Sequence, residues 1–183
     1  MKVKGVAVKT LPKYLLLKYP DVYDNWLREL PQNVRQEYIN GIYVSRWYDV
    51  DAYLRQPLLT AARLAFVEPK QMAWDMGIFS AQDALNGVYR FFLRFGGPAN
   101  MIRRTPFFLE TYYSPANIKL DLLDKDRKYA ELYFYDFVNI EDVIIHRIGG
   151  WGYYTLLASG SNEAKIDLED AGEKDVRMII QWD

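Results

Sequence analysis

The apolar residues of this chain change their spacing close to residue 112, and this change restricts the folds open to it. Before that point they recur at helical spacing, as Val22, Trp26 and Leu30 do. Beyond it, segments 117–122 and 128–137 alternate apolar and polar residues, which is the period of a strand. We therefore predict an α+β fold, with an N-terminal helical subdomain of several short helices followed by a strand-strand-helix-strand-strand antiparallel sheet unit.

The two halves are expected to share one core. The helical half covers about residues 1–111 and the sheet half about residues 112–183 of the 183-residue sequence. No linker rich in glycine, serine and proline separates them, and a chain of this length suits one domain. The prediction is a single domain over residues 1–183.

Local signals predict where several elements begin. Residues 2–10 alternate enough for a short strand, and an extended lead-in fits them equally well. Thr10 then starts a short helix with proline in its first turn. Ser80 and Asp83 form a capping-box-like pair, which predicts that a new helix starts there. Asn139 is the predicted N-cap of the helix that separates the two hairpins.

Each predicted hairpin has one apolar face. In the first hairpin this face contains Ala130, Leu132 and Phe134, and in the second it contains Val176, Met178, Ile180 and Trp182. Tyrosines dominate the opposite face of the first hairpin. This pattern predicts a small antiparallel sheet that is covered on one side.

Charge and cysteine content exclude several classes of function. The sequence has 23 basic and 24 acidic residues, so no global field attracts nucleic acid, and no nucleic-acid partner is predicted. Without cysteine there is no disulfide, thiolate metal site or cysteine nucleophile. No segment reaches the roughly 18 uninterrupted apolar residues of a membrane span. We expect a cytoplasmic protein with no cofactor and no metal.

Candidate catalytic groups are few, and each has a simpler structural explanation. His146 is the one histidine, and a lone imidazole makes a poor metal site. Acidic pairs such as Asp124 and Asp126 fall in turns, where acids are common for backbone reasons. Gly149 and Gly150 lack the lysine of a phosphate loop, and we expect them to let their helix approach the sheet or another chain closely. No catalytic residue and no enzyme activity is predicted, and the role of His146 stays open.

Arginines and aromatic residues gather at the joint between the two halves. Arg90 and Arg94 lie four residues apart on one helical face, and Arg103 and Arg104 follow a short reversal, so the four can converge on an anion. The alternative is that the four arginines lie on the exposed surface and pair with aspartate and glutamate, and this is the interpretation that we prefer. Pro106 is expected to start the last helical turn before the sheet. The candidate ligand-binding set is Arg90, Phe91, Arg94, Arg103, Arg104, Phe107, Tyr112, Tyr133 and Tyr135.

Two classes of function fit this composition, and an enzyme of unknown type ranks third. The first is a non-catalytic sensory or small-molecule-binding domain that holds an apolar ligand, with or without an acidic group, between the helical half and the sheet. The second is a protein-interaction or dimerisation module. It would have a filled core and an exposed aromatic patch around Trp47, Tyr48 or Trp151.

Some segments resemble known bacterial proteins. The stretch "HRIGGWGYYTLLASGSNEAKIDL" and the terminal "RMIIQWD" resemble the end of 4-vinyl reductase-like small-molecule-binding domains. The segments "VKGVAVKTL", "GIYVSRWYDVDAYL" and "RRTPFFLETYY" resemble a group of uncharacterised paralogous bacterial proteins of the myxobacterial type. Both groups are similar to the haem nitric-oxide/oxygen-binding fold. The resemblance implies a ligand-binding domain in bacterial signalling.

The haem-binding branch of this fold is expected to use residues that the chain lacks. The resemblance implies a histidine to iron from the helix before the sheet and a Tyr-x-Ser-x-Arg motif that holds the haem propionates. The matching helix, "AQDALNGVYRFFLRF", has no histidine. In "YYSPANIKL", Tyr112 and Ser114 match the motif, but Ala116 stands in place of the arginine. Haem binding in the family's manner is therefore not expected.

Overall fold

The computed structural model of the chain describes residues 1–85 and 96–183. Its first half contains mostly short helices. They and the first two strands are β1 (Lys2–Lys4), α1 (Gly5–Val8), α2 (Thr10–Lys18), α3 (Pro20–Glu29), α4 (Gln32–Asn40), β2 (Trp47–Asp49), the π-helical turn η1 (Asp51–Arg55), α5 (Gln56–Ala65) and α6 (Pro69–Leu85). The second half contains α8 (Gly97–Tyr112), β3 (Tyr113–Ser114), β4 (Ile118–Asp124), β5 (Tyr129–Phe134), α9 (Val143–Ala158), β6 (Ala164–Gly172) and β7 (Asp175–Trp182).

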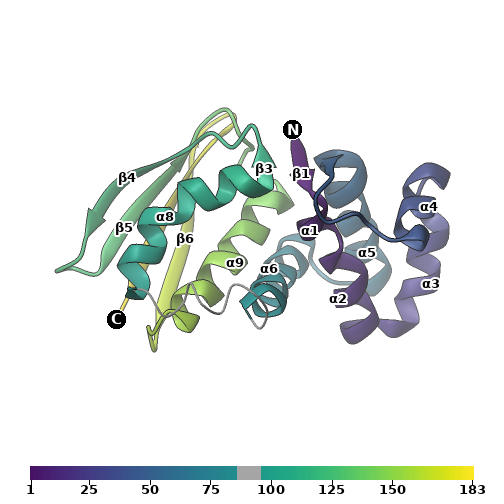
Figure 1. Cartoon of the computed structure of the whole chain (residues 1–183), viewed down its shortest axis with the longest axis horizontal. Helices are drawn as coiled ribbons and strands as arrows, with labels where there is room; N and C mark the ends of the chain where they lie inside the picture. The colour runs from purple at the N-terminus through teal and green to yellow at the C-terminus, as the bar shows by residue number, and fades with distance from the viewer. Residues whose placement is uncertain (86–95) are drawn as a thin grey trace.

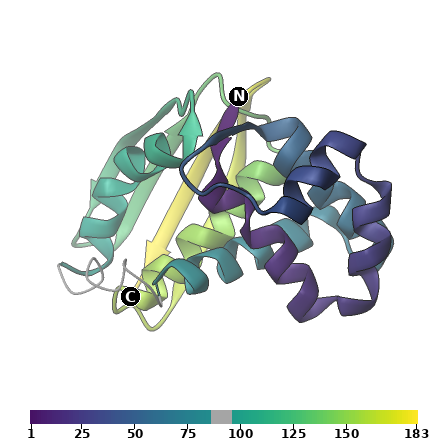
Figure 2. The same cartoon turned by 45° about the vertical axis from the view of Figure 1, so that its right-hand side comes forward.

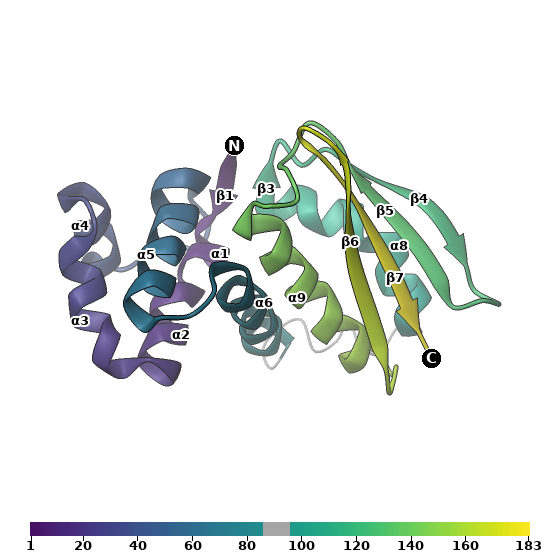
Figure 3. The ribbon, with the colours of Figure 1, turned by 180° about the vertical axis from the view of Figure 1, so that it is seen from behind.

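The elements form layers (Figure 1). Strands β4 to β7 make an antiparallel sheet in the order β4-β5-β7-β6, and α8 and α9 lie over one of its faces. Helix α6 packs on the other side of α9, and the remaining N-terminal helices lie beyond it, as Figure 2 shows from another angle. Seen from behind in Figure 3, the second face of the sheet is not covered by any helix of the described residues.

The predicted α+β architecture is confirmed, including the strand-strand-helix-strand-strand unit. Strand β5 pairs with β7, and opposite Leu132 in β5 stands Met178 in β7. Of the apolar residues predicted for the inner face, Trp182 is half-buried, and the others are buried: Ala130, Leu132, Phe134, Val176, Met178 and Ile180. Because side chains alternate between the two faces of a strand, this apolar face packs on α8 and α9, and the tyrosines of the same strands point to the opposite face.

A second, smaller sheet connects the two halves of the chain. Strand β1 pairs antiparallel with β2 on one side and with β3 on the other. Val3 at its centre is fully buried opposite Tyr48 and Tyr113. The sheet thereby fixes the start of α1 next to the end of α8.

The N-terminal helices pack around Trp26. Its indole ring is fully buried and stands 5.0 Å from the Tyr38 ring, and its Nε1–H donates to the Pro57 carbonyl oxygen at 2.9 Å. The buried residues of these helices and those of the sheet unit form one contiguous hydrophobic cluster. Both halves therefore contribute to the same core.

Several local expectations are wrong. The predicted strand over residues 2–10 ends at Lys4, since α1 starts at Gly5. Helix α6 runs through Ser80 without interruption. The Ser80 hydroxyl does not cap a helix and instead donates to Thr10 Oγ1 at 2.9 Å. Pro106 lies inside α8 and does not start a turn.

The start of α9 also differs from the expectation. Asp142, not Asn139, caps the helix: its Oδ1 accepts from the Ile144 N–H at 2.9 Å. Asn139 accepts instead from the Glu141 N–H within the preceding turn. Asp142 also forms an ion pair with Arg55, with 2.7 Å between Nη2 and Oδ2, and this contact attaches the helix start to η1.

No helix in the described ranges has the length and apolar content needed to cross a membrane.

Candidate functional site

A pocket lies where α8 and α9 pack on the inner face of the sheet. It has a volume of about 230 Å³. Its walls come from α1, the start of α2, the end of α6, both covering helices and strands β5 to β7. The lining residues are Val6, Ala7, Lys9, Thr10, Ser80, Asp83, Ala84, Met101, Ile102, Thr105, Phe108, Leu109, Tyr112, Tyr113, Leu132, Arg147, Ile148, Trp151, Gly152, Thr155, Leu156, Ile166, Met178 and Ile180.

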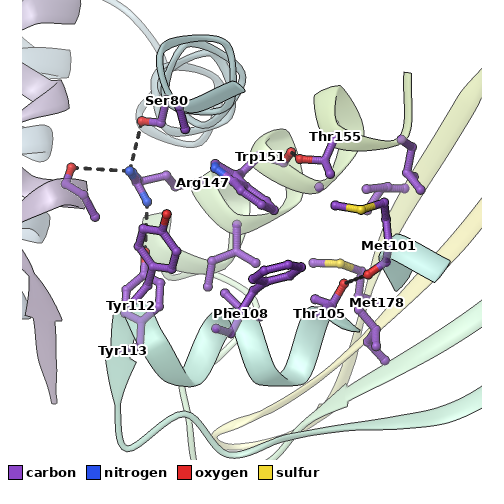
Figure 4. Close-up of a pocket in the computed structure, with 18 of the residues that line it drawn as sticks. Ser80, Met101, Thr105, Phe108, Tyr112, Tyr113, Arg147, Trp151, Thr155 and Met178 are labelled. Carbon is purple, nitrogen blue, oxygen red and sulfur yellow. Dashed lines mark hydrogen bonds between the residues drawn. The ribbon is translucent and has the colours of Figure 1, made fainter. Parts of the chain in front are cut away.

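One end of this pocket is apolar. Met101 at the start of α8 faces Met178 of the sheet, and Phe108 and Trp151 stand between them and the other end, as Figure 4 shows. Met101 and Met178 are both buried, so this end has little contact with water. Such a surface suits a ligand whose larger part is hydrocarbon or aromatic.

The other end of the pocket is polar and is centred on Arg147. This side chain is 4% exposed. Its Nη1 donates to the Tyr113 hydroxyl and its Nη2 to Ser80 Oγ, each at 3.0 Å, and Nη2 also reaches the Ala7 carbonyl oxygen at 3.4 Å. Figure 4 shows the guanidinium held between α6 and the end of α8 by these contacts. These three partners are neutral.

The Arg147 guanidinium has unused hydrogen-bonding capacity. Its Nε is buried and has no hydrogen-bond partner in the described part of the chain. Buried N–H groups nearly always have an acceptor, so this one stands out. The acid that also lines the pocket, Asp83, is paired with Lys13 Nζ at 3.1 Å. Positive charge inside the pocket is thus left without a carboxylate partner among residues 1–85 and 96–183.

A close crossing of α6 and α9 positions Arg147. A Cβ atom on Gly77 would stand 2.1 Å from the Arg147 carbonyl oxygen, and one on Gly150 would stand 2.0 Å from the Trp74 carbonyl oxygen. Only glycine permits such an approach of two helix backbones. The close approach predicted for Gly149 and Gly150 therefore occurs, but the partner is α6 and not the sheet.

The structure separates the residues of the predicted ligand-binding set. Tyr112 lines the pocket. Arg103 and Arg104 are exposed on α8. Phe107 is 66% exposed, because the side of this helix that faces the pocket carries the next residue, Phe108. Arg90, Phe91 and Arg94 lie outside the described residues.

Two tyrosines of the predicted set lie on the far side of the sheet. Tyr133 and Tyr135 stack on each other on the outer face, with 6.3 Å between their ring centroids. The Tyr133 hydroxyl donates to Asp175 Oδ2 at 2.6 Å, which raises the pKa of Tyr133 and lowers the pKa of Asp175. Tyr133 lines a separate polar hollow with Lys119 and Arg177. The predicted cleft therefore does not form as one surface.

The main polar residue of the pocket was missed in the sequence. Arg147 stands within an apolar helical run, between Ile145 and Ile148, and a charged residue in that setting is a signal of a buried polar site. His146, the one histidine of the sequence, does not line the pocket. Its Nε2 lies 2.8 Å from the Ile140 carbonyl oxygen, which gives the ring a local structural partner. Within the described ranges, no group of three or more histidines, cysteines or acids is placed to hold a metal ion.

Comparison with known proteins identifies the fold. No protein-family model and no curated protein sequence matches this chain. Solved structures do match over nearly the whole length. The unliganded Fe(II) H-NOX protein from K. algicida aligns with a TM-score of 0.76 at 14% identity, covering 98% of this chain and 96% of that one. The Fe(II)NO form of the S. oneidensis H-NOX protein aligns with a TM-score of 0.73 at 13% identity, covering 98% and 99%. The chain therefore has the fold of the H-NOX, or haem nitric-oxide/oxygen-binding, proteins.

Proposed function

We propose that this chain is a non-catalytic, small-molecule-binding domain of bacterial signalling, which folds as one unit and holds its ligand in the pocket between α8, α9 and the sheet. The observation that carries the proposal is the pocket itself, about 230 Å³ of mostly apolar space between α8, α9 and the sheet. Ligand sites in proteins are concave and mostly apolar with a few convergent polar groups, and this pocket has both features. The H-NOX fold supports the same function by analogy. A closer kinship to 4-vinyl reductase-like domains, or to the paralogous myxobacterial-type proteins, is part of this proposal, and no family model matches the chain.

Haem attached through a histidine does not fit the residues present. The similar structures include Fe(II) H-NOX proteins, so the residues of this chain are compared with what haem requires. The sequence has one histidine, and it is absent from the pocket wall and bonded to a backbone carbonyl. The sequence has no cysteine either. The proposal therefore concerns a ligand other than histidine-ligated haem.

The alternative of an interaction module loses the aromatic patch that it requires. Tyr48 is buried, Trp47 is half-buried under the Lys4 ammonium, and Trp151 lines the pocket. Trp47 and Tyr48 lie on β2 and Trp151 lies on α9, and none of the three is exposed. The pocket between α8, α9 and the sheet supports ligand binding over the filled core that the alternative predicts.

The test combines detection of a retained ligand with a pocket-filling variant. Native mass spectrometry and an absorption spectrum of the same purified sample identify a bound molecule. Thermal unfolding is then measured with straight-chain acids from octanoate to hexadecanoate, with the corresponding alcohols and with tetrapyrroles. A ligand at 100 times its Kd adds about 2.7 kcal/mol, which corresponds to a rise in Tm of about 5–11 °C in a protein of this size.

Two threonines of α8 provide a matched pair of variants. Thr105 lines the pocket and Thr111 is exposed, and both hydroxyls donate to a carbonyl oxygen of the preceding turn. Thr105→Met should fill part of the pocket and reduce the ligand-induced shift, whereas Thr111→Met should leave it unchanged. A protein with no retained molecule and no shift with any of these compounds would contradict the proposal. A Soret band would assign a tetrapyrrole.

A further inference from the structure

The polar end of the pocket has the features of a built anion site. Arg147 is more than nine-tenths buried, it lines the pocket, and its Nε has no acceptor among the described residues. Burying a charge without a counter-charge is unfavourable, so an unpaired guanidinium persists in a core only when something compensates it. Within residues 1–85 and 96–183, several arginines form ion pairs with acids, but Arg147 forms none.

The neutral partners of Arg147 hold the guanidinium in place without neutralising it. Tyr113 comes from β3 at the end of α8, Ser80 from α6 and Ala7 from α1, so three separate elements fix the group. All three residues also line the pocket. A guanidinium has five N–H donors arranged as a rigid fork, and a fixed fork binds a carboxylate with little loss of entropy. The polar end is therefore organised before a ligand arrives.

Charge at this end favours a ligand with a single negative charge. Among the described residues that line the pocket, Arg147 is the buried cation without an acidic partner. Lys9 at the wall is half-exposed, and water screens its charge. Asp83 adds a negative charge that Lys13 offsets. A carboxylate brings one negative charge and matches one guanidinium. A phosphate monoester brings about −1.5 to −2 at neutral pH and would leave an excess in the pocket.

The opposite end defines the rest of the ligand. Arg147 and its partners lie at one end in Figure 4, and Met101 and Met178 lie at the other, with the rings of Phe108 and Trp151 between them. A molecule that fills this space has a charged head and an apolar body. A fully apolar ligand would leave the guanidinium uncompensated.

We infer that Arg147 anchors the carboxylate of an apolar monocarboxylic acid, whose hydrocarbon or aromatic part lies between α8, α9 and the sheet. The inference rests on the proposed ligand-binding function and specifies its ligand class. It also assigns anion recognition to a buried arginine of α9, in place of the exposed Arg103 and Arg104 of α8.

The test compares ligands that differ only in the head group. Binding of decanoate, methyl decanoate, 1-decanol and decyl phosphate is measured by isothermal titration calorimetry at neutral pH. Charge-assisted hydrogen bonds are the strong ones, so wild-type protein should bind decanoate about 10-fold to 100-fold more tightly than 1-decanol. Arg147→Met should abolish this preference while retaining affinity for 1-decanol. Arg103→Met, which removes an exposed arginine of α8, should bind all four compounds as wild type does.

Each outcome separates the two proposals. Equal affinity of wild-type protein for decanoate and 1-decanol would overturn the assignment of Arg147 and leave the ligand-binding function standing. A preference for decyl phosphate would overturn the carboxylate assignment. Binding of none of these compounds, together with no retained molecule, would overturn both. If Arg147→Met does not fold, Arg147→Lys keeps the charge and loses the fork, and should reduce the preference for decanoate; an unchanged preference would contradict the inference.

Discussion

The crossing of α6 and α9 makes a sharp prediction about Gly150. In Gly150→Ala the new Cβ would stand 2.0 Å from the Trp74 carbonyl oxygen and 2.8 Å from its carbonyl carbon. Both atoms belong to the backbone, so no rotamer change can relieve the contact. A normal separation of non-bonded heavy atoms is about 3.5–4.0 Å, and the two helices would have to move apart by roughly 1.5 Å or more.

Two opposing terms set the expected loss of stability. Alanine is favoured over glycine inside a helix by about 1 kcal/mol. Overpacking a well-packed site costs about 1–3 kcal/mol, and the upper end applies here because the obstacle is a helix backbone. The net loss should be about 2 kcal/mol. For a protein of this size that corresponds to a fall in Tm of about 4–8 °C.

Urea-induced unfolding of three proteins measures this effect. Gly152 lies on the same helix two residues later, and its added Cβ would meet the Ile166 Cδ1 at 3.3 Å, the end of a side chain that can rotate. Gly152→Ala should therefore be neutral or more stable by up to about 1 kcal/mol. If Gly150→Ala proves as stable as wild type or as Gly152→Ala, then α6 and α9 do not pack as closely as the structure indicates.

Two further predictions concern carboxylates. Asp142→Ala removes the cap of α9 and the ion pair with Arg55, and should lower the free energy of unfolding by about 1–2 kcal/mol. Asn139→Ala, at an exposed turn, should lower it far less. Equal losses in urea titrations would contradict the assignment of Asp142 as the cap. Hydrogen bonds from the Tyr133 hydroxyl and a backbone N–H hold the pKa of Asp175 below its ordinary value of 3.8, so this carboxylate stabilises the fold above that pH and the contribution disappears as pH falls through the lowered pKa. Asp175→Asn should thus be less stable than wild type at neutral pH, and the difference should shrink as pH falls below 3.8. A difference that stays constant over this fall in pH would refute the linkage.

Periodicity made much of the fold predictable, because it is a local property of the sequence. The alternation of Ala130, Leu132 and Phe134 determines which face of the first hairpin is apolar, and the same holds for the second. The spacing of Trp26 and Leu30 marks the buried side of α3 and the residue after it in the same way. A strand or helix with one apolar face has few ways to bury it, so the α+β arrangement followed.

Contacts between residues distant in sequence decided what periodicity could not. Ser80 has the local features of a helix cap, yet its hydroxyl binds Thr10 and Arg147, which reach it only when α2 and α9 pack on α6. The choice of Phe108 over Phe107 for the pocket depends on the rotation of α8 about its axis, which the sheet determines.

The pocket itself belongs to this second class. A local pattern predicts a buried helix face around Arg147, but the absence of a carboxylate partner for it in residues 1–85 and 96–183 is a property of the assembled core. The sequence by itself therefore determined the elements and their apolar faces. Tertiary packing decided where the close crossing, the unfilled space and the unpaired charge meet, since each depends on which backbone and side-chain atoms come together from distant segments.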